Sequence, residues 1–340
     1  MRVIDALRRG CGLLLLPLAL VALPSSAQTT SPEPVLSLSK GSGQAYPTKP
    51  VRVIVGFAPG GATDIIARIM SPRLTAAFGQ TFVVENRPGA DSLIAMELVA
   101  RADPDGHLIF LNSSAHTVNP SLYKNANVDA NKDFAAITLI GDVPNVLVVH
   151  PTLPVNTMRE FVDLAKKKKG ELHFASSASI TFLGTALLNK MAGIDTVRLA
   201  YKGAGPAMIA LVSGEAQFML TGIGPVHPHI KSNKLRPIAV SVMKRSPLLP
   251  NIPTITESAV PGYVSSVWYA ALAPAKVPRP IIDRLNTEMR KIMTEPDIKA
   301  GLIAQALELQ PGTPEELQVF MRSETEKWAK VVVESGAKIE

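Results

Sequence analysis

The chain has 340 residues, of which 46% are hydrophobic and 19% are charged. This composition excludes an intrinsically disordered chain or a low-complexity scaffold for most of its length. At roughly 150 residues per domain, the length predicts about two domains, each with enough chain to bury a core. The single cysteine, Cys11, excludes a disulfide framework and a zinc site built on a Cys-x-x-Cys motif.

The N-terminus carries the pattern of a secretory signal peptide. Arg2, Arg8 and Arg9 precede an apolar run at 12–22, and small residues follow at 25–27. A membrane anchor is the alternative, but about 11 apolar residues fall short of the roughly 20 that span a bilayer. We therefore expect a cleaved signal peptide over residues 1–27. A flexible leader rich in Ser, Thr, Pro and Gly should follow over residues 28–45.

The charge of the chain is mildly basic. The formal net charge is +7, and removing the predicted signal peptide, with its three Arg and one Asp, leaves +5. The one dense basic run, 166–169, precedes Gly170 at the end of a predicted helix, where cations complement the helix dipole. Aromatic residues make up only 5% of the chain, whereas nucleic-acid binders interleave basic residues with aromatics. We therefore expect no nucleic-acid partner, but a positive field that attracts small anions.

From residue 46 onward, short β-rich runs alternate with helical patterns. In the first series the predicted strands are 51–56, 82–85 and 108–111, and the predicted helices are 63–78 and 93–100. In the second series the strands are 145–150, 172–175, 197–199 and 218–220, and the helices are 157–168, 182–192 and 206–213. Later come a strand at 236–241, a crossing strand at 268–273, and helices at 278–294 and 314–335. This alternation predicts an α/β architecture with largely parallel sheets, and two lobes joined by more than one strand would form a hinged cleft.

The first candidate binding segment is a glycine-rich turn between a predicted strand and a predicted helix. Gly60 and Gly61 let the backbone approach a ligand, and the free N–H groups at the start of the helix attract anions. The segment lacks the Lys-Ser/Thr of a P-loop and the spacing of a dinucleotide fingerprint. An anion site and a tight turn capped by Thr63 or Asp64 both fit this pattern.

The second candidate segment follows the predicted strand 108–111 and contains short polar side chains and a histidine. Ligands of open α/β sheets bind at loops after the carboxyl ends of parallel strands. Ser113 and Ser114 could donate hydrogen bonds to a carboxylate, while His116 and Asn119 could hold the shape of the loop. A Ser/His nucleophilic pair is the alternative, but no nucleophile-elbow motif accompanies it.

Three further loops follow predicted strands in the second half of the chain. They contain, in chain order, Ser176 and Ser177, Lys202 and Gly203, and Thr221. Helix capping and ligand binding need the same residue types here, so spacing leaves both interpretations open. The close histidine pair at 227–229 has no nearby carboxylate to complete a metal site, so we expect no metal.

Several short motifs, taken in order, resemble the solute-binding proteins of tripartite tricarboxylate transporters, often called the Bug family. In the first half these motifs are Tyr46-Pro47, Pro59-Gly60-Gly61-x-x-Asp64, Glu85-Asn86-Arg87-Pro88-Gly89-Ala90 and His116-x-x-Asn119-Pro120. In the second half they lie at 145–151, 201–207, 228–231, 249–254 and 328–332. Each motif is short, but their order and spacing cover nearly the whole chain after residue 45, which makes the resemblance specific.

The resemblance implies a periplasmic binding protein with two α/β lobes, each a mostly parallel sheet flanked by helices, hinged by crossing strands. One lobe would comprise residues 46–146 and 271–340, and the other 147–270. Such a protein captures a small organic carboxylate in the cleft and delivers it to membrane subunits of a tripartite tricarboxylate-type transporter. It works as a monomer, without a catalysed reaction or a cofactor. The residues expected to bind the ligand are Phe57, Pro59, Gly60, Gly61, Asp64, Ser113, Ser114, His116, Ser176, Ser177, Lys202, Gly203 and Thr221.

The sequence departs from the family pattern at three places. Asp91-Ser92 replace the usual Gly-Gly, Phe182 stands where His is frequent, and Thr221-Gly222 stand where many relatives carry Asp-Asn. A polar ligand group would therefore meet a neutral hydroxyl in the second lobe. We expect an organic acid with a carboxylate at one end and a less charged, aromatic or aliphatic remainder.

Two other functions fit the same cleft. A periplasmic enzyme would use the loop serines and His116 as nucleophile and base, and turnover of a bound acid would distinguish it from a binding protein. A binding protein that signals its closed state to a sensor needs the same residues as one that serves a transporter. A neighbouring transporter gene would favour transport.

Overall fold

The computed structural model describes residues 46–201 and 204–336. The predicted signal peptide and leader lie outside the described residues, as do Lys202 and Gly203. Within the described ranges, no helix combines the length and the apolar character needed to cross a membrane.

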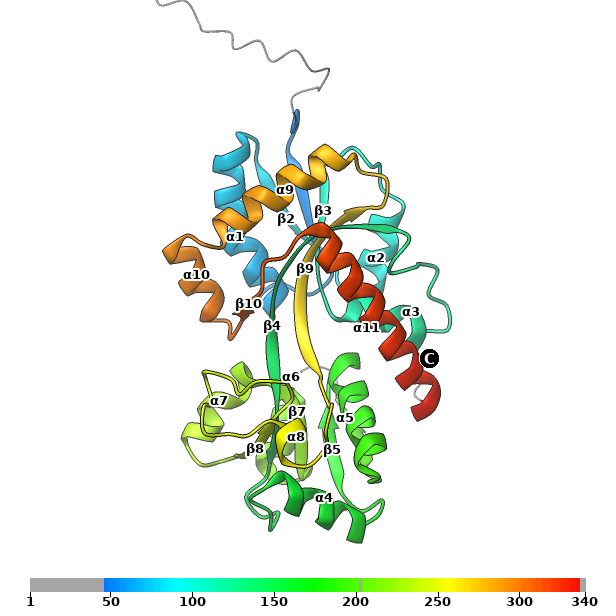
Figure 1. The fold of residues 1–340 in the computed structure, drawn as a ribbon, viewed down its shortest axis with the longest axis vertical. Helices are drawn as coiled ribbons and strands as arrows, with labels where there is room; N and C mark the ends of the chain where they lie inside the picture. Colours follow the sequence, from blue (N-terminus) through cyan, green and yellow to red (C-terminus); the bar gives the residue numbers. More distant parts are fainter. Residues whose placement is uncertain (1–45, 202–203, 337–340) are drawn as a thin grey trace, which may run out of the picture. The chain divides into compact units, whose positions relative to one another are not determined.

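The first lobe is built on a mixed sheet (Figure 1). Its parallel strands are β2 (Phe82–Asn86), β1 (Val51–Val55) and β3 (Leu108–Ser113), in that spatial order. Next come β9 (Ser266–Pro274) and β4 (Phe134–Val149), which run antiparallel to their neighbours, and the short β10 (Glu308–Leu309) pairs with β4. The register places Val55 of β1 beside Asn86 and Leu111. The loops after β1 and β3 therefore begin at nearly the same level of the sheet.

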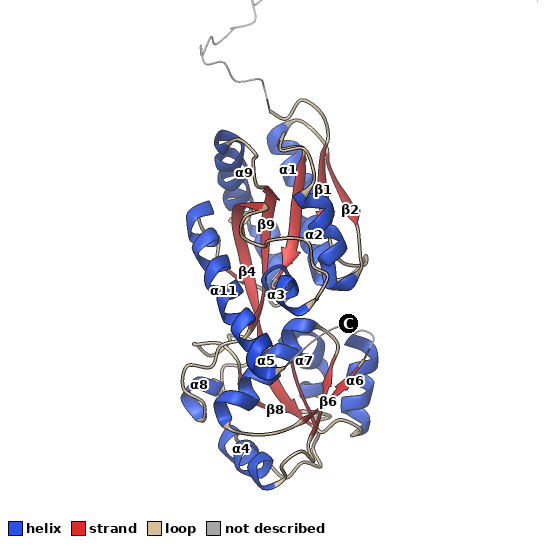
Figure 2. Cartoon of the chain, turned by 90° about the vertical axis from the view of Figure 1, so that its right-hand side faces the viewer, coloured by secondary structure: helices blue, strands red, loops and turns tan. Residues whose placement is uncertain are grey.

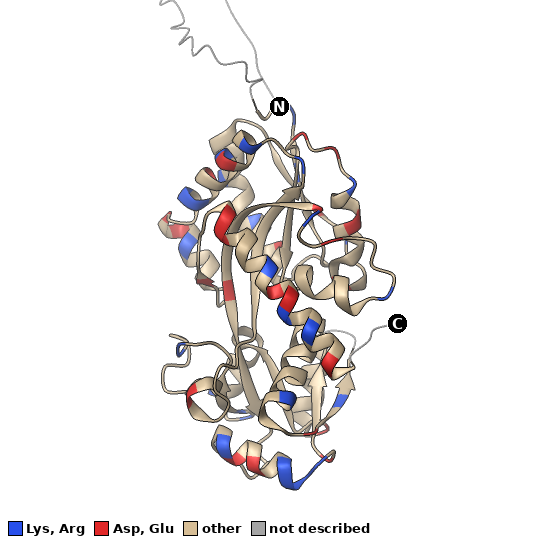
Figure 3. Ribbon diagram, turned by 45° about the vertical axis from the view of Figure 1, so that its right-hand side comes forward, with Lys and Arg blue, Asp and Glu red and all other residues tan. Residues whose placement is uncertain are grey.

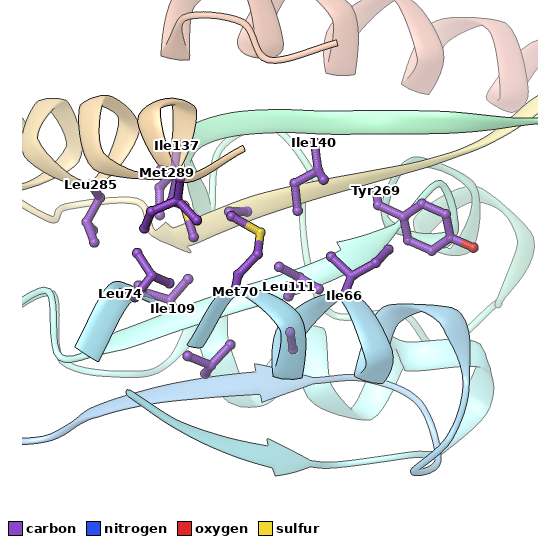
Figure 4. Packing of buried hydrophobic residues seen from close by; sticks show 14 of the residues in the cluster. Ile66, Met70, Leu74, Ile109, Leu111, Ile137, Ile140, Tyr269, Leu285 and Met289 are labelled. Atoms are coloured by element: carbon purple, nitrogen blue, oxygen red, sulfur yellow. The ribbon is translucent and has the colours of Figure 1, made fainter. Parts of the chain in front are cut away.

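Successive side chains of β1 point to opposite faces of this sheet, as in any strand. Val53 and Val55 belong to a core shared with α1 (Ala62–Phe78), α9 (Arg279–Ile292) and α10 (Pro296–Ile303). Figure 4 shows this core, in which side chains of α1 and α9 meet those of the strands. Ile54 belongs instead to a core beneath α2 (Leu93–Ala100) and α11 (Pro314–Ser335). Both faces of β1 are thus buried, which explains its continuous apolar run at 53–55.

The second lobe contains another mixed sheet. β5 (His173–Ser176) pairs in parallel with β6 (Val197–Ala200) and β7 (Phe218–Gly222), while the last part of β4 runs antiparallel to β7 and to β8 (Arg236–Val240). One core includes residues of α4 (Met158–Lys167), α5 (Ser179–Ala192) and α8 (Ile255–Ser258), and the other includes residues of α6 (Ala204–Ser213) and α7 (Ile223–Lys231). Charged residues lie mostly on the helices rather than on the strands (Figure 3). The basic run 166–169 lies at the C-terminal end of α4, as its composition predicts.

Two strands and one helix run along both lobes (Figure 2). β4 pairs with β9 along its first part and with β7 and β8 along its last part. α11 contributes Leu317 to a core of the first lobe and Trp328 to a cluster shared with α3 (Ala115–Leu122) and α5. This is the predicted arrangement of two α/β lobes hinged by crossing strands. Each sheet is mixed because the crossing strands run antiparallel to their neighbours. The lobe boundaries at 146 and 271 stay predictions, because β4 belongs to both sheets.

Several elements were not predicted from the sequence. α3 contains Pro120 and α7 contains Pro225 and Pro228, and their composition favoured loops. β4 begins at Phe134, whereas the pattern predicted a strand only from residue 145. Two register shifts in its pairing with β9 break the alternation that marks a strand. α10 and β10 were missed as well, because Gly301 weakens the helical pattern of α10 and β10 has only two residues.

Candidate functional site

The turn after β1 exposes backbone at the start of α1. Ala58, Pro59 and Gly60 are exposed, and Gly60 has a φ of 83°, a left-handed conformation that favours glycine. Gly61 is the N-cap of α1 in an extended conformation and, as a glycine, has no side chain to cap the helix. The first N–H groups of a helix have no partner within it. Those of α1 are therefore placed to bind an anion such as a carboxylate.

Asp64 holds this turn in shape. Its carboxylate accepts hydrogen bonds from the backbone N of Gly60 (2.9 Å), from Nε of Arg68 (3.0 Å) and from Nδ2 of Asn86 (2.9 Å). Asn86 Nδ2 also donates to the carbonyl of Phe57 at 3.0 Å. Burial alone would raise the pKa of Asp64, but the hydrogen bonds outweigh burial and lower this pKa to about 2. Of the residues expected to bind the ligand, Asp64 and Phe57 therefore support the turn from inside the lobe.

The residues after β3 lie beside this turn. Ser113 ends β3 and Ser114 follows it, and both are buried. The backbone N of Ser114 donates to the carbonyl of Trp268 at 2.9 Å, and Ser113 Oγ accepts from the backbone N of Ala115 at 3.4 Å. The Ser114 hydroxyl has no hydrogen-bond partner among the described residues. Because a buried hydroxyl without a partner costs stability, Ser114 Oγ is a candidate donor to a ligand.

His116 lies within the first lobe, on α3 rather than in a loop. It is fully buried, its Nε2 lies 2.9 Å from the carbonyl oxygen of Ala130, and its ring contacts Phe134 edge-on with centroids 4.5 Å apart. Burial lowers the pKa of His116 to about 4 and outweighs the opposite effect of the hydrogen bond to Ala130. A neutral, buried imidazole supports the position of α3, in keeping with the expectation that His116 holds the shape of this segment.

In the second lobe the predicted residues lie at the carboxyl ends of parallel strands. Ser176 ends β5, which Ser177 follows, and Thr221 lies near the end of the neighbouring parallel strand β7. Ser176 and Thr221 are buried and Ser177 is half-buried. The Ser176 hydroxyl, like that of Ser114, lacks a hydrogen-bond partner in the described part of the chain. The predicted contacts of residues 202–203 lie outside the described residues.

Side chains of the two lobes meet at the start of α5. Asp91 of the first lobe accepts a hydrogen bond from the backbone N of Ser179 at 3.3 Å and another from the Ser179 hydroxyl. Asn119 donates through Nδ2 to the carbonyl of Asp91 at 2.5 Å, and its Oδ1 accepts from the Ser179 hydroxyl at 3.3 Å. The sequence marked Asp91 only as a departure from the family pattern and did not indicate Ser179. No local pattern could find this contact, because 88 residues separate the two side chains.

The arrangement suits binding by hydrogen bonds. In residues 46–201 and 204–336, no group of three or more His, Cys, Asp and Glu side chains could hold a metal ion. The close histidine pair, His227 and His229, lies on α7. The hydrogen bond of His116 is to a backbone carbonyl rather than to a serine hydroxyl. The candidate residues of both lobes offer backbone N–H groups and hydroxyls, the donors that a carboxylate accepts from.

Asp142 makes the stability of the crossing strand β4 depend on pH. Burial raises its pKa, a hydrogen bond from Ser266 opposes this, and the charges of Glu308 and Glu324 add to the increase, so that the pKa is about 6 instead of 3.8. The folded state then binds the proton more tightly than the unfolded state does. The resulting stabilisation is complete below about pH 4 and is lost as the pH rises through about 6.

We expect Asp142→Asn to raise the free energy of unfolding at pH 7.5 by about 1 to 2 kcal/mol, because the amide stays neutral where the carboxylate must ionise. At pH 4 the variant and the unchanged protein should be nearly equally stable. Urea denaturation at both pH values measures this difference, with the exposed Asp163→Asn as the control. An equal gain at pH 4 and pH 7.5 would show that ionisation of Asp142 is not the cause.

Comparisons with known proteins agree with this geometry. The chain matches the TctC family model, described as the tripartite tricarboxylate transporter family receptor, over residues 66–337. It is 33% identical to the protein BugT of Bordetella pertussis over 302 residues, which cover 88% of this chain and 93% of that protein. It is also similar to the structure of R. palustris Rpa4515 with adipate, with 31% identity and a TM-score of 0.76, covering 86% of this chain and 100% of that one. For the periplasmic binding protein BugD the identity is 30% and the TM-score 0.73, covering 87% and 100% of the two chains. These similarities confirm the periplasmic binding protein fold.

Proposed function

We propose that this chain, which belongs to the TctC family of tripartite tricarboxylate transporter receptors, captures a small organic carboxylate between its lobes and delivers it to a transporter of that type. The family is one of binding proteins rather than enzymes, and the related BugD is a periplasmic binding protein. The signal-peptide pattern of residues 1–27 supports the same location for this chain. The adipate bound to the R. palustris relative supports a carboxylate ligand.

One structural observation at the candidate site supports the proposal. Each lobe has a buried serine hydroxyl without a described partner at the carboxyl end of a parallel strand. These hydroxyls belong to Ser114, after β3, and Ser176, at the end of β5. Ligands of open α/β sheets bind at such strand ends. The uncapped start of α1 at Gly61 adds backbone donors beside the first of them.

In the proposed complex, the free N–H groups at the start of α1, directly after the turn at 59–61, bind one carboxylate, assisted by Ser113 and Ser114. Ser176, Ser177 and Thr221 close on the ligand from the second lobe, together with Lys202 and Gly203, which follow β6 in the sequence. Asp64, Phe57 and His116 keep the first-lobe segments in place. The lobes close by bending at the crossing strands β4 and β9.

The proposal is tested by measuring ligand binding to residues 28–340 with thermal shift and calorimetry. The library contains monocarboxylates, dicarboxylates, tricarboxylates and the uncharged amide of each acid. An acid at 100 times its Kd should add about 2.7 kcal/mol to the free energy of unfolding, and its amide should add almost nothing. Because purified protein can retain a ligand, the sample is unfolded, dialysed and refolded first. If no acid shifts this ligand-free protein, the carboxylate proposal is wrong.

Loss of either buried hydroxyl should weaken binding without unfolding the protein. For Ser114→Ala and Ser176→Ala we expect Kd to rise about tenfold, since each change removes one hydrogen bond to a charged group. The free energy of unfolding should change by less than about 1 kcal/mol, because neither hydroxyl has a described partner to lose. Ser323→Ala, an exposed serine on α11, is the matched control. An unchanged Kd in both site variants would contradict the assignment of these serines.

Ligand binding should also change the tryptophan fluorescence. The chain has two tryptophans, and the indole N–H groups of Trp268 and Trp328 donate to Glu324 Oε2 at 3.3 and 2.9 Å. Trp268 lies on β9 and Trp328 on α11, two of the elements that run along both lobes. A hinge movement therefore alters the surroundings of both fluorophores. A titration with the acid identified above measures this, and an emission spectrum unchanged at saturation would argue against a hinge movement at these elements.

A further inference from the structure

The N-termini of α1 and α5, both at the candidate site, differ in the groups that lie beside them. Neither α1, with Gly61 as N-cap, nor α5, with Ala178 as N-cap, has a side-chain cap from its N-cap residue. The turn before α1 is exposed. At α5, by contrast, the carboxylate of Asp91 from the other lobe accepts from both the backbone N and the hydroxyl of Ser179. Among the described residues, the start of α1 therefore has only the carboxylate of its own Asp64, which is paired with Arg68, whereas the start of α5 binds a carboxylate from the other lobe.

The position of this internal carboxylate is held by its surroundings. Ala90, Asp91 and Ser92 have φ values of 45°, 50° and 81°, a left-handed region that such residues rarely adopt. Strained backbone of this kind persists only where contacts hold it. Here Asn119 Nδ2 donates to the Asp91 carbonyl, and Ser92 Oγ donates to Asn112 Oδ1 at 2.9 Å.

The negative charge of Asp91 affects the titration of a neighbouring tyrosine. Burial raises the pKa of Tyr123, and the charge of Asp91 raises it further. The described hydrogen bonds to the Asp91 carboxylate come from a neutral hydroxyl and a backbone N–H group. A second carboxylate brought to this place would compete for the same donors and would be repelled at short range.

We propose that Asp91 is a specificity-determining residue, a carboxylate built into the protein that occupies the start of α5 and restricts the ligand to acids with a single carboxylate. This inference rests on the proposed function. The ligand carboxylate binds at the open turn before α1, and the remainder of the ligand meets the second lobe, where Thr221 offers a neutral hydroxyl. Adipate, the ligand of the R. palustris relative, carries a carboxylate at each end and would place one of them against Asp91.

The test compares acids that share a carbon skeleton and differ by one terminal carboxylate: butyrate with succinate, hexanoate with adipate, and benzoate with terephthalate. Calorimetry gives the Kd of each acid for the unchanged protein, for Asp91→Gly and for Asp91→Asn. We expect the unchanged protein to bind the monocarboxylate of its preferred pair at least about tenfold tighter, because like charges placed together discriminate strongly against a ligand. In Asp91→Gly the ratio of the two Kd values should move by about 100-fold toward the dicarboxylate. Asp91→Asn, which keeps the size of the side chain but removes the charge, should move it in the same direction by less.

The control is Asp103→Gly, an exposed loop aspartate of the same lobe, which should leave the ratio unchanged. If Asp91→Gly does not fold, the Asp91→Asn result alone decides between the two outcomes. Binding of both acids with the same ratio in the unchanged protein and the Asp91 variants would overturn the specificity role and leave the proposed function intact. Failure of every acid to bind any ligand-free variant would overturn the proposed function, and this inference with it.

Discussion

Replacing Asp64 by asparagine should lower the free energy of unfolding by about 2 to 4 kcal/mol and weaken carboxylate binding at least tenfold. The buried carboxylate accepts hydrogen bonds from Gly60, Arg68 and Asn86. An amide turns one acceptor into a donor, so at least one of these donors loses its partner. The turn at 57–61 then loses the contact that fixes Gly60, and with it the position of the backbone donors.

The pH dependence of the same variant supplies a second readout. The pKa of Asp64 is about 2 in the folded state, below its ordinary value of 3.8. The carboxylate therefore stabilises the folded protein above about pH 4, and this stabilisation is lost as the pH falls through about 2. Urea denaturation at pH 7 and pH 3 should show the Asp64→Asn difference shrinking at the lower pH.

The control for this prediction is Arg68→Gln. Its side chain is 54% exposed, and its removal leaves Asp64 bonded to Gly60 and Asn86. We expect a smaller loss of stability than in Asp64→Asn and nearly unchanged ligand affinity. Equal losses in the two variants would mean that the ion pair, rather than the hydrogen bonds to the turn, holds this segment.

Replacing Gly56 by alanine should cost about 3 kcal/mol or more of stability and abolish ligand binding. A Cβ at Gly56 would lie 1.8 Å from Ser92 Oγ and 2.5 Å from Ser92 Cβ, far inside van der Waals contact. Ser92 cannot easily give way, because it is fully buried and its hydroxyl donates to Asn112. The clash must therefore displace the turn after β1 or the segment 90–92, and both belong to the candidate site.

A second substitution should rescue the first. Ser92→Gly removes the obstructing side chain at a position where φ is 81° and glycine is unstrained. We expect Gly56→Ala/Ser92→Gly to regain most of the lost stability, with a coupling free energy of at least about 2 kcal/mol in the double-mutant cycle. Gly205→Ala, where a Cβ meets nothing within 4 Å, should be nearly neutral. Additive effects in the cycle would show that the contact with Ser92 is not what excludes a side chain at residue 56.

The local elements of the fold could be predicted from the sequence where one pattern dominated. Helices 93–100 and 314–335 have the predicted bounds, and the parallel strands were found within one or two residues. These elements could be predicted because their apolar runs and the turn residues beside them depend on the burial of one segment, which its own sequence reflects. The placement of Ser113, Ser176 and Thr221 at strand ends was confirmed for the same reason.

By itself, therefore, the sequence determined the alternation of strands and helices, the family, and the strand ends near which most of the candidate residues lie. Only the tertiary structure decided which of those residues are engaged inside a lobe, as Asp64 and His116 are, and which have a hydroxyl with no partner among the described residues, as Ser114 and Ser176 do. It alone brought Asp91 to Ser179. The physical reason is that local patterns report how one segment is buried. A contact between lobes depends instead on how two sheets are joined by the crossing strands, and no single segment contains that information.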